Sequence, residues 1–289
     1  MVGGEYEIFP DGRIGVSYTH RYLNKVVEDM SNDEANTYFI GNPGYGIGRT
    51  FPKAVRTYDA VTFYFQKAFA HTWLAQASYT ISSLRGNYSG LFRPETGQLD
   101  PNITNDFDIR SILGNRMGPL PFDQTHQIKV YGAKDFQLPA NMDILLGLTF
   151  RTESGTPQNY FGSNSLYGLD EVFILPRGSA GRGDWIFHFD ARVGYSVQLG
   201  KQRQIGVTLD VFNLFNFQGV TQRDNRFTSA DVLPIIGGTM KDLPTAKSSG
   251  KLRHEDGTPF DPVQINPIFG NPTQYQDPRQ FRFGAKVTF

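Results

Sequence analysis

Few residues in this chain have the types and spacing that chemistry requires. The chain contains no cysteine, which excludes thiolate nucleophiles, disulfides and cysteine-ligated zinc. Its histidines are scattered without the spacing of metal ligands; they are His20, His71, His126, His188 and His254. No Ser/His/Asp set and no catalytic carboxylate pair can be picked out. We therefore expect no enzyme activity, no catalytic residue, no cofactor and no metal.

One segment concentrates oxygen-bearing side chains and is the strongest candidate for a metal site. It contains Asp100, Asn102, Asn105, Asp106 and Asp108. Carboxylate and amide oxygens are the ligands that calcium prefers, but Asp and Asn are also the ordinary residues of turns. The loop interpretation is favoured, and no metal site is assigned.

Two short motifs resemble binding sequences without the context that such sites need. The glycine-rich "GYGIG" at 44–48 lacks the preceding buried strand and following helix of a phosphate-binding loop. The "RGD" at 182–184 matches an adhesion tripeptide, and chance explains it better. We interpret both as loop residues.

Charge and hydropathy exclude several classes of protein. The 28 Lys and Arg residues balance the 28 Asp and Glu residues, so the chain lacks the basic excess of a nucleic-acid-binding protein. The longest apolar run is Val172 to Leu175, far below the roughly 20 residues of a transmembrane helix. Transmembrane β-strands are not excluded, because they need only about 9 to 11 alternating residues.

The chain opens on "MVGGEYEIF", which alternates like a strand and carries no secretion leader. Two interpretations follow. Either the protein is cytoplasmic, or the chain is a piece of a protein whose N-terminus lies elsewhere.

Alternation of apolar and polar residues predicts β-strands throughout the chain. At the C-terminus, for example, Arg282, Gly284, Lys286 and Thr288 separate five apolar residues. Nine segments have this period: 2–8, 13–27, 56–67, 73–83, 125–136, 142–151, 187–199, 205–211 and 279–289.

The connections between these segments alternate between short and long. Short turns are expected at 10–12, 68–72, 138–141 and 200–203, and long loops at 28–55, 84–124, 152–184 and 218–278. Long loops without structure count against a compact soluble domain, whereas short turns at one end and long loops at the other are typical of outer-membrane barrels. The sequence therefore predicts an all-β, transmembrane antiparallel β-barrel. A soluble β-sandwich is the alternative.

The polar side of the predicted strands fits a barrel lumen. It carries Glu5, Glu7, Arg13, Arg21, His188, Asp190, Arg192, Asp210, Arg282 and Lys286. A sandwich would place the same residues in solvent, so this face alone does not decide between the folds. If the short turns are periplasmic, the last strand ends at the periplasmic rim of the barrel. The aromatic ring of its last residue then lies at the membrane interface.

Several segments resemble a known family. They are "VGGEYEIFPDGRIGVSYTHRYL", "FYFQKAFAHTWLAQASYTISSLRGNYSGLFRPETGQLDPNITNDFD", "FDQTHQIKVYGAKDF", "TLDVFNLFN" and "PRQFRFGAKVTF". Over essentially the whole chain they are similar to the C-terminal half of TonB-dependent outer-membrane transporters, and most of all to the Oar-like group.

The resemblance implies a barrel of about 22 strands that is blocked by an N-terminal plug and energised by TonB. Nine strands are an odd set, which cannot close with every neighbour antiparallel. We therefore expect residues 1–289 to be the C-terminal part of a receptor barrel, with no plug domain present. Transport would need the full-length protein.

The resemblance also implies a location and partners. We expect the outer membrane of a Gram-negative bacterium, contact with outer-membrane lipid, a plug domain and TonB system in the full-length protein, and an unidentified ligand. The terminal alternating residues resemble the signal read by the barrel assembly machinery; they are Phe281, Phe283, Ala285, Val287 and Phe289. A simple role as lipid-facing wall is the other interpretation.

The expected function is energised uptake of a ligand, with specificity in the long loops, because loops meet the ligand while strands form the wall. A passive porin or a surface-adhesion barrel without TonB is the alternative. A soluble carbohydrate-binding sandwich is a third hypothesis. The ligand itself is not predicted.

Overall fold

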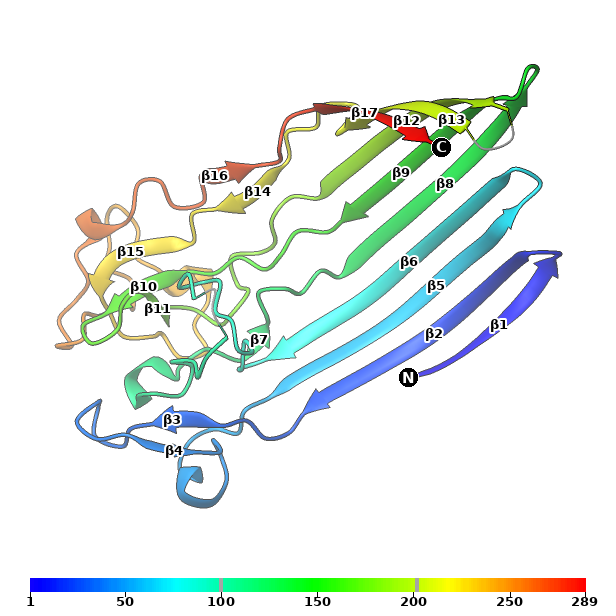
Figure 1. The fold of residues 1–289 in the computed structure, drawn as a ribbon. Coiled ribbons are helices and arrows are strands. Elements are labelled where there is room, and N and C mark those ends of the chain that lie inside the picture. Colours follow the sequence, from blue (N-terminus) through cyan, green and yellow to red (C-terminus); the bar gives the residue numbers. More distant parts are fainter. Residues whose placement is uncertain (99–100, 201–202) are drawn as a thin grey trace.

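A computed structural model describes residues 1–98, 101–200 and 203–289. Long strands lie side by side in one sheet, with short turns at one end and long connections at the other (Figure 1). We call these the turn end and the loop end. The N- and C-terminal strands form the two opposite edges of the sheet.

Nine long strands form most of the sheet, and each pairs antiparallel with the next long strand along the chain; the two-residue strand β7 (Gly118–Pro119) also pairs with β6. The prediction of nine strands in an all-β antiparallel fold is confirmed for the described residues. The strands are β1 (Val2–Phe9), β2 (Gly12–Leu23), β5 (Arg56–Ala70), β6 (Trp73–Gly86), β8 (His126–Leu138), β9 (Met142–Glu153), β12 (Ile186–Leu199), β13 (Arg203–Phe212) and β17 (Gln280–Thr288).

The turns at the turn end are tighter than the sequence predicts. Strands β5 and β8 continue past their expected ends, so only His71 and Thr72 separate β5 from β6. Both residues have positive φ, as do Ala140 and Asn141 in the β8–β9 turn. Two consecutive residues of positive φ form the turn type that fits the twist of a hairpin. The predicted turn at 200–203 includes residues 201 and 202, which lie outside the described residues.

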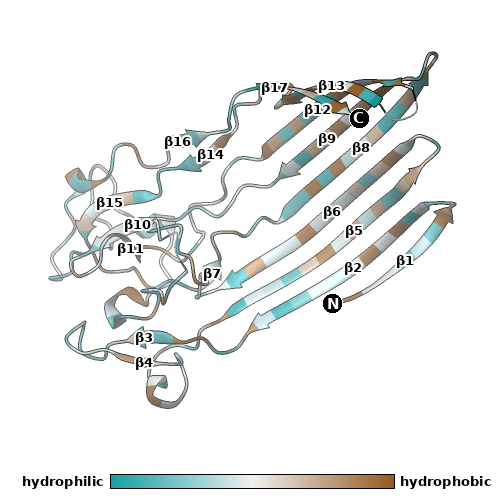
Figure 2. Cartoon of the chain, in the orientation of Figure 1, coloured by the Kyte–Doolittle hydropathy of each residue, from teal (hydrophilic) through white to brown (hydrophobic). Residues whose placement is uncertain are grey.

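The register places the apolar residues of adjacent strands in rows on one face of the sheet. Phe150 lies opposite Phe189, and Leu209 lies between Val193 and Phe283. Figure 2 shows the resulting alternation of hydrophilic and hydrophobic residues along the strands. This is the two-residue period of a strand whose faces meet different surroundings.

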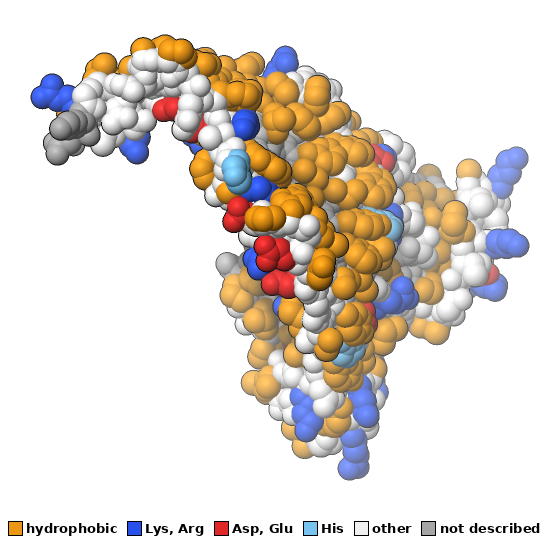
Figure 3. Space-filling view, turned by 90° about the vertical axis from the view of Figure 1, so that its right-hand side faces the viewer, with side chains coloured by type: hydrophobic (Ala, Val, Ile, Leu, Met, Phe, Trp, Pro, Cys, Tyr) orange, Lys and Arg blue, Asp and Glu red, His pale blue; other side chains and the backbone are white. Residues whose placement is uncertain are grey.

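The protein leaves this apolar face largely uncovered. A soluble sandwich would bury Leu146, Val193 and Phe283 in one centre, but they are 40%, 45% and 79% exposed. The sandwich alternative is therefore wrong. Viewed from the turn end, the sheet curves as an open arc with hydrophobic side chains gathered along one side of it (Figure 3).

The expectation that the long connections are loops without regular structure is wrong. They contain β3 (Glu28–Met30), β4 (Phe39–Gly41), η1 (Gly46–Gly48), η2 (Arg110–Ile112), β7 (Gly118–Pro119), β10 (Phe161–Asn164), β11 (Gly168–Phe173), β14 (Val220–Arg223), β15 (Arg226–Asp231), η3 (Met240–Asp242), η4 (Pro262–Gln264) and β16 (Pro272–Tyr275). Strand β10 pairs antiparallel with β11 and parallel with β15, which joins two loops that are far apart in sequence. We call this folded set of connections the loop unit.

The most deeply buried apolar side chains lie in the loop unit. One cluster includes Ile109, Ile174 and Leu252, each with no exposed surface. A second cluster surrounds Met30 and Phe107. The loop unit therefore has hydrophobic cores of its own, separate from the sheet. No helix among the described residues is long and apolar enough to cross a membrane.

Candidate functional site

The loop unit buries charged side chains as well as apolar ones. Three arginines and three acids lie within the predicted loops 84–124 and 152–184: Arg93, Arg116, Arg177, Glu95, Asp106 and Glu171. The side chains of Arg93 and Asp106 have no exposed surface. We call these six residues the charge cluster.

Ion pairs connect the members of the charge cluster across the two loops. The Arg93 Nη1 atom lies 2.8 Å from the Glu171 Oε2 atom. Asp106 Oδ1 contacts Arg93 Nε at 3.3 Å and Arg116 Nη1 at 2.5 Å. The charges balance within the cluster, so each buried ion has a partner of opposite sign.

The pKa values in the cluster follow from burial and from these partners. Burial alone would raise the pKa of Asp106, but the charges of Arg93 and Arg116 outweigh it and hold the pKa below its usual value. Burial and the nearby charge of Arg93 lower the pKa of Arg116 to about 10. All three residues are therefore charged at neutral pH.

Another buried carboxyl group, outside the charge cluster, joins strand β3 to loop 84–124. The Glu28 Oε2 atom accepts hydrogen bonds from the backbone nitrogen and the hydroxyl of Thr104, at 2.8 and 3.1 Å. Burial raises the pKa of Glu28 to about 8. Nearby, burial raises the pKa of Asp108 to about 7, although a 2.7 Å hydrogen bond from Tyr167 opposes this. Glu28 is mainly protonated at neutral pH.

The loop unit encloses a polar hollow of about 580 Å³. Two arginines on its wall are already neutralised: Arg223 binds Asp184 at 2.8 Å, and Arg226 binds Asp170 at 2.6 and 2.9 Å. Gln158 and other amide and hydroxyl side chains complete much of the lining. Such a surface can recognise a ligand through hydrogen bonds.

The sheet brings some of the predicted lumen-face residues together. Arg13 pairs with Glu5 at 3.1 Å. Elsewhere, Arg192 and Arg282 flank Asp210, at 3.0 and 2.9 Å. The remaining members share the face without joining these groups; they are Glu7, Arg21, His188, Asp190 and Lys286.

Rings gather on the apolar face near the loop end. His126 stacks on both Tyr79 and Trp185, with ring centroids 6.1 and 5.7 Å apart. Trp185 in turn stacks on Phe187. Rings with one polar edge concentrate at the border between hydrocarbon and water, so this group indicates one border of a membrane-spanning band.

The predicted C-terminal signature lies along one face of β17 and just beyond its end. Four of its members pair with the apolar row of β13, and Phe289 follows the strand with 90% of its surface exposed. The members are Phe281, Phe283, Ala285, Val287 and Phe289. Their role in assembly stays a prediction.

The RGD motif has internal partners. Arg182 pairs with Asp123, and Asp184 pairs with Arg223. Both charges of the tripeptide are therefore used within the loop unit. The "GYGIG" segment forms a single three-residue turn of 3-10 helix, η1, without a following α-helix.

The carboxylates and amides of the 100–108 segment serve internal contacts as well. Asn105 donates a 2.6 Å hydrogen bond to Glu171, and Asn102 binds the next backbone nitrogen. Asp100 lies outside the described residues. The described residues contain no group of three His, Cys, Asp or Glu side chains arranged to hold a metal.

A comparison with known proteins identifies the type of sheet. Over 295 aligned positions that include the whole chain, the sequence is 51% identical to the TonB-dependent transporter Oar of Myxococcus xanthus. The chain therefore matches a portion of an Oar-like TonB-dependent transporter. It spans 28% of the length of that relative. No family model and no solved structure matches the chain.

The relationship and the exposed apolar face together identify the nine-stranded sheet of this Oar-like chain as part of a transmembrane antiparallel β-barrel. In such a barrel the apolar side faces lipid, and the opposite side lines the lumen. The loop unit stands at one end of the wall (Figure 1).

Sequence reasoning did not find the charge cluster. Charged residues in a polar segment give no local signal of burial, because burial depends on contacts between distant loops. The apolar run Val172–Leu175 did indicate a buried segment within the predicted loop 152–184. All four residues are at most 1% exposed and lie in the interior of the loop unit.

We expect Asp106→Asn to destabilise the loop unit. Removing the Asp106 carboxylate leaves three buried arginines with only two buried acids, and breaking a buried ion group in this way costs about 3–5 kcal/mol. Hydrogen exchange of the protein in detergent should show lost protection in loops 84–124 and 152–184. The exposed control Asp256→Asn should retain it. Equal protection in both variants would show that the buried ion pairs contribute little to the stability of the loop unit.

We expect Glu28 to make the loop unit less stable as pH rises. Its folded pKa of about 8 lies above its usual value of 4.5, so the folded state binds more protons and loses stability between those two pH values. Melting in detergent at pH 5 and pH 9 should show a smaller loss for Glu28→Gln than for the unmodified protein. Asp108 accounts for the loss that remains.

The exposed residue Glu34 on the same loop provides the control. Glu34→Gln should keep the full pH dependence. If Glu28→Gln behaves like Glu34→Gln, the burial of Glu28 does not control the pH response.

Proposed function

We propose that this chain forms part of the barrel of an outer-membrane transporter that takes up its ligand with energy supplied through TonB. The 51% identity to the transporter Oar across the whole chain carries this proposal. The lipid-facing row of side chains supports the location, because such a face needs a bilayer. A role without enzyme activity is part of the proposal.

In the full-length protein, a plug domain would fill the lumen and the TonB system would act from the periplasm. The turn end would then be periplasmic and the loop end extracellular. The loop unit would select the ligand. Its buried clusters favour a surface of fixed shape, which reduces the entropy lost when a ligand binds.

Two measurements on the full-length protein test this function. Fractionation should find it in the outer membrane as a heat-modifiable band. The purified periplasmic domain of TonB, used as the probe in surface plasmon resonance, should bind the purified transporter. Failure to bind, together with open-channel conductance in planar bilayers without TonB, would assign the chain to a passive porin instead. Failure to bind without such conductance would favour an adhesin.

We also propose that the C-terminal signature directs barrel assembly. Deleting Phe289 from the full-length protein should reduce the heat-modifiable outer-membrane band, because the deletion removes the terminal aromatic ring that the assembly machinery would recognise. Phe289→Tyr preserves a ring and should retain the band. Undiminished assembly of the deletion variant would leave these residues with a wall role alone.

A further inference from the structure

An apolar pocket lies where the wall meets the loop unit. It borders the end of β2, the start of β5 and loop 84–124, and its volume is about 560 Å³. Pockets of about 300–1,000 Å³ are typical of small-molecule sites. The lining includes five apolar side chains that are 38–58% exposed: Leu23, Val27, Leu91, Phe92 and Phe122. The pocket is therefore open and large enough to admit a small molecule.

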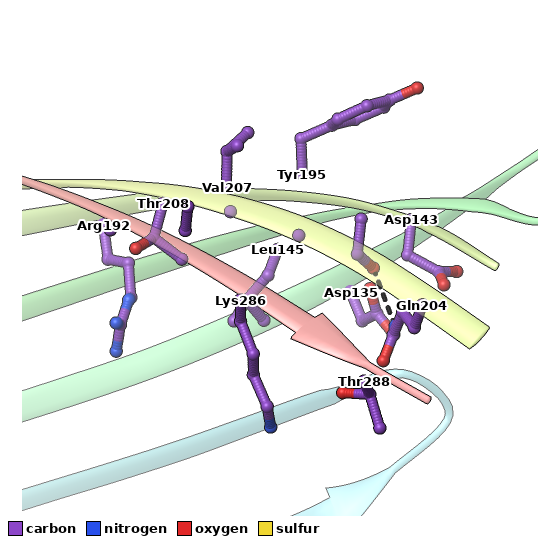
Figure 4. A pocket seen from close by; sticks show the side chains of 15 residues that line it. Asp135, Asp143, Leu145, Arg192, Tyr195, Gln204, Val207, Thr208, Lys286 and Thr288 are labelled. Atoms are coloured by element: carbon purple, nitrogen blue, oxygen red, sulfur yellow. Dashed lines mark hydrogen bonds between the residues drawn. The ribbon is translucent and has the colours of Figure 1, made fainter. Parts of the chain in front are cut away.

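The base of the pocket belongs to the lumen side of the wall. Figure 4 shows the two faces of the sheet: Arg192 and Lys286 project to one side, and Tyr195 projects to the other. The register of the paired strands continues the face of Arg192 across the sheet to Arg56 and its partner Leu23. Lipid on the opposite face does not cover the pocket, and contiguous exposed apolar surface of this kind marks a binding site.

One charged side chain, that of Arg56, contributes to the lining. In the loop unit, the half-buried Arg223 and Arg226 pair with Asp184 and Asp170. Arg56 is half-buried too, but it forms no ion pair with any described carboxylate. A cation in apolar surroundings is stabilised by an anion beside it. The lining therefore indicates a ligand with a negatively charged group.

Two neighbouring residues of loop 84–124 fix the position of this guanidinium. The Arg56 Nη1 atom donates a hydrogen bond to the backbone carbonyl of Ser89. Gly90 has a φ of 103°, and a Cβ atom at this position would lie 2.9 Å from Arg56 Nη1. The glycine thus leaves space for the guanidinium. Its remaining N–H groups, which no described residue accepts, are suited to bind a carboxylate through two hydrogen bonds.

We propose that this pocket binds a small amphipathic anion, a carboxylate on an aliphatic chain. The carboxylate would pair with Arg56, and the chain would lie against Leu91, Phe92 and Phe122. A peptide would place unpaired amide groups against the same side chains, which is unfavourable, and a sugar would do so with hydroxyl groups. The lining therefore favours a hydrocarbon chain over both.

This inference rests on the proposed function and deepens it, since the anion would be the ligand that the transporter takes up. The pocket lies at the loop end of the wall, where a ligand arriving from outside would reach the lumen. Binding of the anion needs neither TonB nor transport, so the two proposals fail separately.

The experiment uses the full-length protein in lipid nanodiscs, because detergent would compete for the pocket. Isothermal titration calorimetry measures the binding of octanoate, with the heat from empty nanodiscs subtracted. Hexanoate and decanoate complete a chain-length series, and affinity should rise about fourfold for each methylene that enters the pocket. Octan-1-ol, which has the same chain without the charge, should bind about tenfold more weakly than octanoate.

Arg56→Gln should weaken octanoate binding about 10-fold to 100-fold, the change expected for loss of a charged hydrogen-bond partner. Arg56→Lys keeps the charge and should restore part of the affinity. The control is Arg85→Gln, which should leave the affinity unchanged. Arg85 is exposed and pairs with Thr57, the residue after Arg56, so it lies on the opposite face. A heat-modifiable band of normal intensity shows that each variant barrel has folded.

The apolar part of the pocket is tested by Leu91→Gln, which should reduce the gain in affinity for each added methylene. Leu166→Gln is the matched control and should leave this gain unchanged. Leu166 is 55% exposed, close to the 52% of Leu91, but it does not line the pocket.

Equal octanoate affinity in Arg56→Gln and the unmodified protein would overturn the site, and so would equal affinity for octanoate and octan-1-ol. If Arg56→Lys binds as weakly as Arg56→Gln, Arg56 serves only to hold Ser89, which overturns the site too. No octanoate binding by a protein that still binds TonB would overturn the pocket and leave the transport function intact. Octanoate binding without TonB binding would contradict the transport function alone.

Discussion

The whole structure depends on one missing contact: no described residue of the chain covers the apolar side of the nine-stranded sheet. In a soluble protein a second layer would bury Leu146 and Phe283, and that layer would be the core. In an outer-membrane barrel, lipid takes the place of that layer. The chain's own hydrophobic cores are consequently found outside the wall, in connections that must fold in water around Ile174 and Met30.

The arrangement of charged side chains differs between the loop unit and the sheet for the same reason. In the loop unit, the charge cluster is fully buried and balanced, because an unpaired ion there would be costly. On the lumen face, Arg192 and Arg282 outnumber the single carboxylate between them and stay partly exposed.

The wall could be predicted from the sequence because its strands follow a local rule. Alternation identified β12 and β17 almost to the residue, and the short turns fixed their order. The loop unit could not be predicted in the same way. Its parallel pairing of β10 with β15 joins distant segments, and the burial of Arg93 and Asp106 depends on contacts between loops 84–124 and 152–184.

The pairing of β10 with β15 also ties part of the wall together at the loop end. Residue Phe161 lies beside Arg226, and the hairpin of β12 and β13 separates them in the chain. The segment that enters this hairpin and the segment that leaves it are therefore joined above its open end. The pairing closes a ring of chain that contains both strands of the hairpin, so β12 and β13 are held together at the loop end as well as along their length.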